Sequence, residues 1–136
     1  MSKFNLKSGL LFAALALALA AAFFAMPSSA QAAEWHIRDD ATGGGCSSIG
    51  NWNADSKTCT LSKNLSQEGI VIDSNNITLD GNGHTIYGGF QGYGVYLLGK
   101  TGVTIKNVNV QYFPRGIYLD SSSGNTLIGK SASNNN

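Results

Sequence analysis

The chain has 136 residues; 43% of them are hydrophobic and only 12% are charged, and nine basic residues stand against eight acidic ones. A nearly neutral chain without a basic patch excludes nucleic acid as a partner, because counterion release from phosphates needs clustered Lys and Arg. Residues 33–136 are sufficient for one small domain.

The first 32 residues have the order of a secretory signal peptide. Lys3 and Lys7 form a basic start, Leu10 to Phe24 is an apolar run, and Ala30 and Ala32 supply small residues. We expect cleavage after Ala32, or else after Ala30, and a secreted, periplasmic or cell-surface protein. Cleavage removes both lysines and no acid, which leaves a net charge of −1. A membrane anchor is the competing interpretation, but a membrane span needs about 20 apolar residues and this run is shorter. We expect no membrane span in the chain that remains after cleavage.

Residues 33–68 do not repeat, and we interpret them as an N-terminal cap. The first coil of a stacked β structure exposes an unpaired strand edge, which must be covered. Cys46 and Cys59 are expected to form a disulfide that holds the cap together after export. A redox pair or a thiolate metal site is the alternative, but neither a C-x-x-C spacing nor an adjacent His favours it. Trp35 and Trp52 are expected to be lids on the core rather than ligand platforms.

A 22-residue repeat fills much of residues 69–136. Gly94-Val95-Tyr96-Leu97 returns as Gly116-Ile117-Tyr118-Leu119, and Gly102-Val103-Thr104-Ile105 returns as Gly124-Asn125-Thr126-Leu127. A unit this short cannot bury its own apolar face and must stack on the next copy. The sequence therefore predicts an all-β fold of about three stacked coils, the last of them incomplete.

Alternation along the strands assigns the two faces of each coil. Aliphatic side chains should point inward, where each contributes about 1.5 to 3 kcal/mol of transfer free energy. The predicted inward positions are Ile70, Ile72, Ile77, Leu79, Ile86, Val95, Leu97, Val103, Ile105, Val108, Val110, Ile117, Leu119 and Leu127. The predicted outward positions are Val71, Thr78, Tyr96, Thr104, Tyr118 and Thr126. The competing local interpretation is a β-hairpin at Asp80-Gly81-Asn82-Gly83, because Asn-Gly is a strong turn signal, but one hairpin would not explain the repeat.

The segment Ile77-Thr78-Leu79-Asp80-Gly81-Asn82-Gly83-His84-Thr85-Ile86, with the repeats that follow it, resembles the exported right-handed parallel β-helix repeat proteins. These include the periplasmic NosD-type proteins and the group of carbohydrate-binding and sugar-hydrolysing β-helices. The resemblance covers about residues 68–136 and implies a right-handed parallel β-helix. It implies one of three roles: a non-catalytic scaffold that binds polysaccharide, the N-terminal part of a polysaccharide lyase or glycoside hydrolase, or a periplasmic maturation factor of the NosD type.

Two features predict a ligand-binding surface. Fourteen residues separate Leu79 from Gly94, whereas ten separate Ile105 from Gly116, so the first coil carries four extra residues. Protruding loops of this kind concentrate function, and a tolerated insertion is the alternative. Aromatic residues also share repeat positions, Tyr96 with Tyr118 and Phe90 with Tyr112, so each pair should be adjacent on successive coils. These pairs form either a sugar platform or an ordinary cross-strand stabilisation. The candidate ligand-binding residues are Phe90, Gln91, Tyr93, Tyr96, Tyr112, Arg115 and Tyr118.

No complete catalytic set accompanies these candidates. Asp73, Asp80, Asp120 and His84 do not form the paired carboxylates of a glycosidase or the acid cluster of a calcium-dependent lyase. Arg115 is the one candidate lyase base, and a salt bridge to Asp120 is its alternative role. We expect no metal site and no cofactor, because copper binds His, Met or Cys clusters and residues 33–136 contain no methionine.

The repeat register indicates that the third coil is still under way at Asn136. We therefore expect the chain to be the N-terminal part of a longer protein or a truncated reading frame. An uncapped coil exposes unpaired strand edges, so self-association through this end is a further expectation.

Overall fold

The structure is a computed structural model that describes residues 33–135; the predicted signal peptide lies outside these residues. Within them the chain forms short strands and one helical turn. The elements are β1 (Ala33–Ile37), α2 (Cys46–Ile49), β2 (Gly50–Asn53), β3 (Thr58–Leu61), β4 (Leu65–Ser66), β5 (Glu68–Ile72), β6 (Thr78–Asp80), β7 (Thr85–Tyr87), β8 (Tyr93–Leu98), β9 (Thr104–Lys106), β10 (Asn109–Gln111), β11 (Arg115–Asp120), β12 (Thr126–Ile128) and β13 (Ser131–Ser133). No helix in residues 33–135 is long and apolar enough to cross a membrane.

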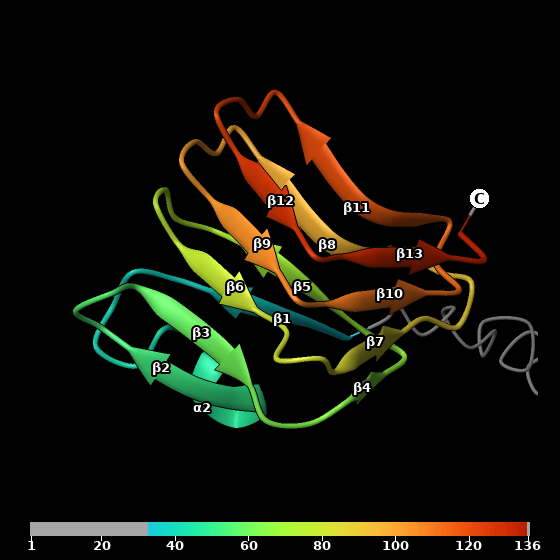
Figure 1. Cartoon of the computed structure of the whole chain (residues 1–136), viewed down its shortest axis with the longest axis horizontal. Helices are drawn as coiled ribbons and strands as arrows, with labels where there is room; N and C mark the ends of the chain where they lie inside the picture. Colours follow the sequence, from blue (N-terminus) through green and yellow to red (C-terminus); the bar gives the residue numbers. More distant parts are fainter. Residues whose placement is uncertain (1–32, 136) are drawn as a thin grey trace, which may run out of the picture. The chain divides into compact units, whose positions relative to one another are not determined.

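The strands form three sheets that wind into a parallel β-solenoid of about three turns (Figure 1). Sheet A has the strand order β1-β5-β8-β11, sheet B has β12-β9-β6-β3-β2, and sheet C has β13-β10-β7-β4. Each turn places one strand in each sheet, beginning with β5, β6 and β7. The predicted all-β fold of stacked coils is confirmed.

The register across neighbouring turns confirms the 22-residue step. Tyr96 lies beside Tyr118 across β8 and β11, and Thr104 lies beside Thr126 across β9 and β12. The preceding turn is longer, because Ile70 of β5 pairs with Val95 of β8. Positions that share a place in the repeat are therefore neighbours in space, about 4.8 Å apart along the solenoid.

Aliphatic side chains fill the interior in columns. Of the 14 residues predicted to point inward, all but three are buried; Ile117, Leu119 and Leu127 of the last turn are partly buried and pack against the core. These three are less covered because no further turn lies on them within residues 33–135. The core also contains residues that the sequence analysis did not assign to it: Ile37, Ile49, Leu61, Leu65 and Phe113.

The alternative of a β-hairpin at Asp80–Gly83 is wrong. Strands β6 and β7, which flank this turn, belong to sheets B and C and do not pair with each other. Asn82 and Gly83 do have positive φ angles, 49° and 79°, so the Asn-Gly signal marks a tight turn as expected. Here the turn is the corner between two sheets rather than the end of a hairpin.

The cap is held by the predicted disulfide, which joins Cys46 of α2 to Cys59 of β3 with a Cα–Cα distance of 5.8 Å. Strand β2 pairs antiparallel with β3, so it ends sheet B with a reversed strand. Strand β1 pairs in parallel with β5 and extends sheet A by one strand. Trp35 and Trp52 are partly buried and pack against the core, as expected for lids.

Candidate ligand-binding site

Glycine near the start of two strands of sheet A fixes which candidate residues face outward. In β8, Gly94 and Val95 are both buried, and the partly exposed Tyr93 and Tyr96 flank them. Strict alternation from Tyr96 would have turned Tyr93 inward. Because Gly94 and Val95 both face inward, Tyr93 and Tyr96 both lie on the outer face of the sheet. A Cβ added at Gly94 would lie 2.2 Å from Cγ1 of Val110. Only glycine fits there, in the manner of a glycine at a strand irregularity.

The same pattern recurs in β11, where Gly116 and Ile117 lie between Arg115 and Tyr118. Arg115 pairs with Tyr93, and Tyr118 pairs with Tyr96. The outer face of sheet A therefore carries two neighbouring columns, one with Tyr93 and Arg115 and the other with Tyr96 and Tyr118.

Three tyrosine rings on this face are stacked on one another. The ring centroids of Tyr93 and Tyr96 are 4.8 Å apart, those of Tyr93 and Tyr118 are 5.1 Å apart, and those of Tyr96 and Tyr118 are 5.6 Å apart. The interplanar angles are 18°, 9° and 11°. We call Tyr93, Tyr96 and Tyr118 the tyrosine stack. Stacked aromatic pairs contribute about 0.5 to 1.5 kcal/mol beyond their buried area, so the stack helps to stabilise sheet A.

The phenol of Tyr96 is held in its neutral form. Desolvation raises its pKa above the usual value of 10.0, and the negative charge of Asp120 raises the pKa further. A neutral phenol both donates and accepts a hydrogen bond. Tyr96 thus adds a hydroxyl group to the apolar ring surface of the tyrosine stack.

Arg115 lies against the tyrosine stack. Its guanidinium carbon is 4.5 Å from the ring centroid of Tyr118 and 5.8 Å from that of Tyr93, and its Nη1 donates a 3.3 Å hydrogen bond to the Tyr93 hydroxyl. The salt bridge to Asp120 considered from the sequence is wrong. Arg115 and Asp120 occupy opposite ends of the six-residue strand β11, about 16 Å apart at about 3.3 Å per residue.

A second aromatic group lies at the corner between sheets C and A. The ring centroid of Tyr112 is 5.0 Å from that of Tyr87 and 5.6 Å from that of Phe90, which it meets edge to face. We call Tyr87, Phe90 and Tyr112 the corner group. Phe90 is 61% exposed and Tyr87 40% exposed. The predicted adjacency of Phe90 and Tyr112 on successive coils is confirmed, also by a 3.0 Å hydrogen bond from the Phe90 N–H to the Tyr112 carbonyl.

Tyr87 was not among the candidates from the sequence. It follows the buried Ile86 in β7, and alternation from Ile86 would have placed it outward. Its counterpart in the next turn is Gln111, so the repeat gave no aromatic pair at this position. The alternation of inward and outward residues along β7 could have identified Tyr87, whereas the 22-residue repeat could not.

Two members of the corner group, Phe90 and Tyr112, have an unusual backbone conformation. Residues at this corner have left-handed φ angles in successive turns: Gln67 at 60°, Phe90 at 61°, Tyr112 at 59° and Asn134 at 53°. Left-handed backbone is uncommon for residues other than glycine, and a bulky aromatic there is an outlier. Such strain costs about 1 to 3 kcal/mol per residue and clusters at functional positions.

The four extra residues of the first coil are divided between two loops, one between sheets B and C and one between sheets C and A. Thr78 pairs with Thr104 and Thr85 with Asn109, so seven residue steps in the first turn correspond to five in the second. Thr85 to Tyr93 spans eight steps and Asn109 to Arg115 spans six. The second lengthened loop, between sheets C and A, carries Phe90 of the corner group and the exposed Gln91.

Asp80 and His84 lie outside sheet A, which carries the tyrosine stack. Asp80 forms an ion pair with Lys106 at 3.2 Å on sheet B. Partial burial raises the pKa of Asp80, but hydrogen bonds from the Asn82 N–H, Asn107 and Lys106 outweigh it, so the pKa lies below its usual value. His84 contacts the Asn64 side chain at 3.3 Å. None of these groups faces a second carboxylate.

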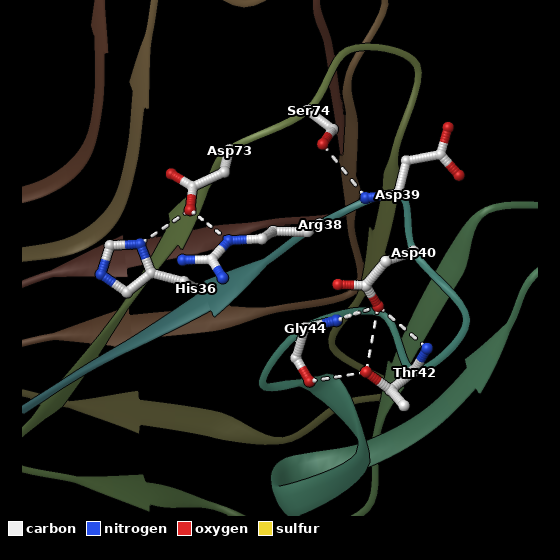
Figure 2. Close-up of polar contacts among 8 residues, drawn as sticks. All are labelled: His36, Arg38, Asp39, Asp40, Thr42, Gly44, Asp73 and Ser74. Carbon is white, nitrogen blue, oxygen red and sulfur yellow. Dashed lines mark hydrogen bonds and ion pairs between the residues drawn. The ribbon is translucent and has the colours of Figure 1, made fainter.

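The cap contributes a polar cluster at the other end of sheet A (Figure 2). One carboxylate oxygen of Asp73 lies 2.9 Å from Nδ1 of His36 and 3.1 Å from Nε of Arg38. The Asp39 N–H donates to the Ser74 hydroxyl. These contacts join β1 and the turn that follows it to the turn after β5, and this structural role explains them.

Asp40 organises the turn that follows (Figure 2). Its Oδ1 accepts hydrogen bonds from the N–H groups of Gly44 and Thr42, each at 2.9 Å, and from the Thr42 hydroxyl at 3.0 Å. These bonds lower the pKa of the Asp40 carboxyl, the bond from Gly44 most strongly. The carboxylate is committed to the turn.

The described residues contain no group of three His, Cys, Asp or Glu side chains arranged to hold a metal ion. No protein-family model matches the chain, and no curated protein and no solved structure matches it significantly. The β-solenoid is therefore established by the strand pairing alone, and the comparisons support no family assignment, including the resemblance to NosD-type proteins.

Proposed function

We propose that this protein is an exported, right-handed parallel β-helix that binds polysaccharide on one surface and carries out no catalysis in this segment. The right-handed winding is favoured because parallel crossover connections are right-handed in about 98% of cases. The disulfide between Cys46 and Cys59 supports export, since disulfides persist mainly in oxidising compartments.

The exposed corner group is the observation that carries this proposal. Phe90 keeps a large apolar ring in solvent and a backbone conformation that glycine would adopt without strain. Gln67 and Asn134 occupy the same left-handed corner in other turns, so the fold does not require an aromatic residue at this position. Strained, exposed aromatic residues at a loop on a rigid scaffold are typical of a binding surface.

The neighbouring tyrosine stack supports a sugar ligand in particular. The corner group and the stack are joined by the connection from Tyr87 to Tyr93, and together they combine apolar ring surface with phenol hydroxyls and the guanidinium of Arg115. Sugar rings present apolar C–H faces and hydroxyl edges, which amphipathic aromatic side chains complement. We call the two groups together with Arg115 the aromatic surface.

The test measures binding of the mature protein to a panel of soluble polysaccharides by affinity gel electrophoresis. Phe90→Ala is expected to weaken binding about tenfold, which corresponds to about 1.4 kcal/mol. Ile128→Ala is the matched control, because Ile128 is 55% exposed on sheet B, away from the aromatic surface, and its loss should leave binding unchanged. Far-UV circular dichroism checks that both variants are folded. Absence of binding to every polysaccharide, or unchanged binding by Phe90→Ala, would contradict the proposal.

The alternative of a lyase or hydrolase has less support. Asp80 lies on sheet B in an ion pair with Lys106, and Asp73 is engaged by His36 and Arg38. A glycosidase needs two carboxyl groups about 5 to 9.5 Å apart facing one bond. The aromatic surface contains no such pair.

A further inference from the structure

Arg115 is a cation without an ionic partner on the aromatic surface. Three Lys or Arg ion pairs and one His–Asp contact occur among residues 33–135, and none of them includes Arg115. The side chain is exposed, and of its five N–H donors one is used by the Tyr93 hydroxyl. The other donors remain for a ligand.

The rings of the tyrosine stack hold this cation in place. The guanidinium lies over the Tyr118 ring at 4.5 Å, and the hydrogen bond to Tyr93 fixes its orientation. A positioned guanidinium loses little side-chain freedom when it binds a ligand, which favours affinity. Its planar fork matches the two oxygens of a carboxylate or a sulfate, a pairing that is stronger than a neutral hydrogen bond.

The charged residues around Arg115 are distributed unevenly along sheet A. Asp120 lies at the far end of β11, and Asp73, which forms an ion pair with Arg38, lies beyond the end of β5. Glu68 occupies the column of Tyr93 and Arg115, with Tyr93 between the two charges. Arg115 therefore places a positive charge at the beginning of β11, and Asp120 places a negative charge at its end.

We infer that Arg115 binds the carboxylate or sulfate of an acidic sugar, so that the ligand of the aromatic surface is an acidic glycan. This inference rests on the proposed function, since it names the chemical class of the same ligand. Uronates and sulfated sugars present the same oxyanion to a guanidinium. The sugar ring that carries the oxyanion would lie next to the tyrosine stack.

The experiment compares polymers that differ only in charge. A polyuronate is paired with its carboxyl-reduced neutral form, and dextran sulfate is paired with dextran. Dissociation constants are measured by isothermal titration calorimetry on the mature protein at two salt concentrations. Arg115→Gln is expected to weaken binding to the acidic member of a pair at least tenfold and binding to the neutral member less than twofold. The polymer pair that shows this difference identifies the oxyanion as carboxylate or sulfate.

Two further variants distinguish a specific binding site at Arg115 from nonspecific attraction of polyanions to positive charge. Lys130→Gln removes the same charge from an exposed residue between β12 and β13, away from the aromatic surface, and should change binding less than twofold. Arg115→Lys keeps the charge but loses the planar fork, and should recover only part of the affinity. Equal losses in Arg115→Gln and Lys130→Gln would overturn the inference.

The outcomes distinguish this inference from the proposed function. If neutral and acidic polymers bind equally well and Phe90→Ala weakens both, the protein binds glycans but the role of Arg115 is wrong. If no polymer binds, the proposed function fails and the inference falls with it.

Discussion

At the scale of single residues, the backbone of Phe90 makes a prediction that is independent of any ligand. Its φ angle is 61°, which costs about 1 to 2 kcal/mol for a residue with a Cβ and nothing for glycine. Phe90→Gly should therefore be more stable than Phe90→Ala by about 1 kcal/mol, which reverses the usual order. Urea unfolding of the two variants measures this difference.

Tyr87 provides the control for this comparison. It is exposed like Phe90 and belongs to the same corner group, but it lies in the regular strand β7 and is not among the residues with positive φ. Tyr87→Gly should be less stable than Tyr87→Ala by about 0.5 to 1 kcal/mol. If glycine were the less stable choice at both positions, the corner would hold no strain and the main support for a binding surface would be lost.

At the scale of elements, the repeat predicted the pairing of β8 with β11 because one apolar pattern fixes the register wherever one face is buried. It did not predict that Tyr93 and Arg115 face outward, because simple alternation does not include the two consecutive inward residues that glycine permits. Strand β1 also escaped prediction. Its sequence Ala33-Glu34-Trp35-His36-Ile37 shares no repeat signature, and its place beside β5 depends on long-range pairing.

Gly94 gives the prediction that belongs to this scale. An added Cβ would lie 2.2 Å from Cγ1 of Val110 and 2.5 Å from the Gly116 carbonyl oxygen, so the strands must separate or shift. Gly94→Ala should lower the free energy of unfolding by about 2 to 3 kcal/mol, as overpacking does. It should also weaken the near-ultraviolet circular dichroism of the tyrosine stack, because Tyr93 and Tyr96 flank this position.

Gly99→Ala is the matched control at another glycine of the solenoid. An added Cβ there meets no atom within 4 Å, although the φ angle is 62°. Only backbone strain applies, so the loss should be about 1 kcal/mol and the tyrosine signal should be unchanged. Equal unfolding free energies for the two variants would show that the close approach at Gly94 does not govern the arrangement of β8.

At the scale of the whole solenoid, stability is transmitted from turn to turn, because each turn contacts only its neighbours. The cap covers the first turn with the buried residues Ile37, Ile49 and Leu61, and the disulfide closes a loop between residues 13 apart in sequence. Loosening the cap should therefore expose the turn that begins with β5 before it affects the turn that begins with β11.

The double variant Cys46→Ala with Cys59→Ala tests this order. Loss of the crosslink should lower the free energy of unfolding by about 3 kcal/mol in the chain-entropy model. Trp35 and Trp52 both lie in residues 33–68, so tryptophan fluorescence reports on the cap while far-UV circular dichroism reports on the coils. In urea, the fluorescence midpoint should shift further than the dichroism midpoint. Identical shifts of both signals would contradict this order and would mean that cap and coils unfold as one cooperative unit. The strand pairs β1 with β5 and β3 with β6 would then couple the cap to the first turn at least as strongly as successive turns are coupled to each other.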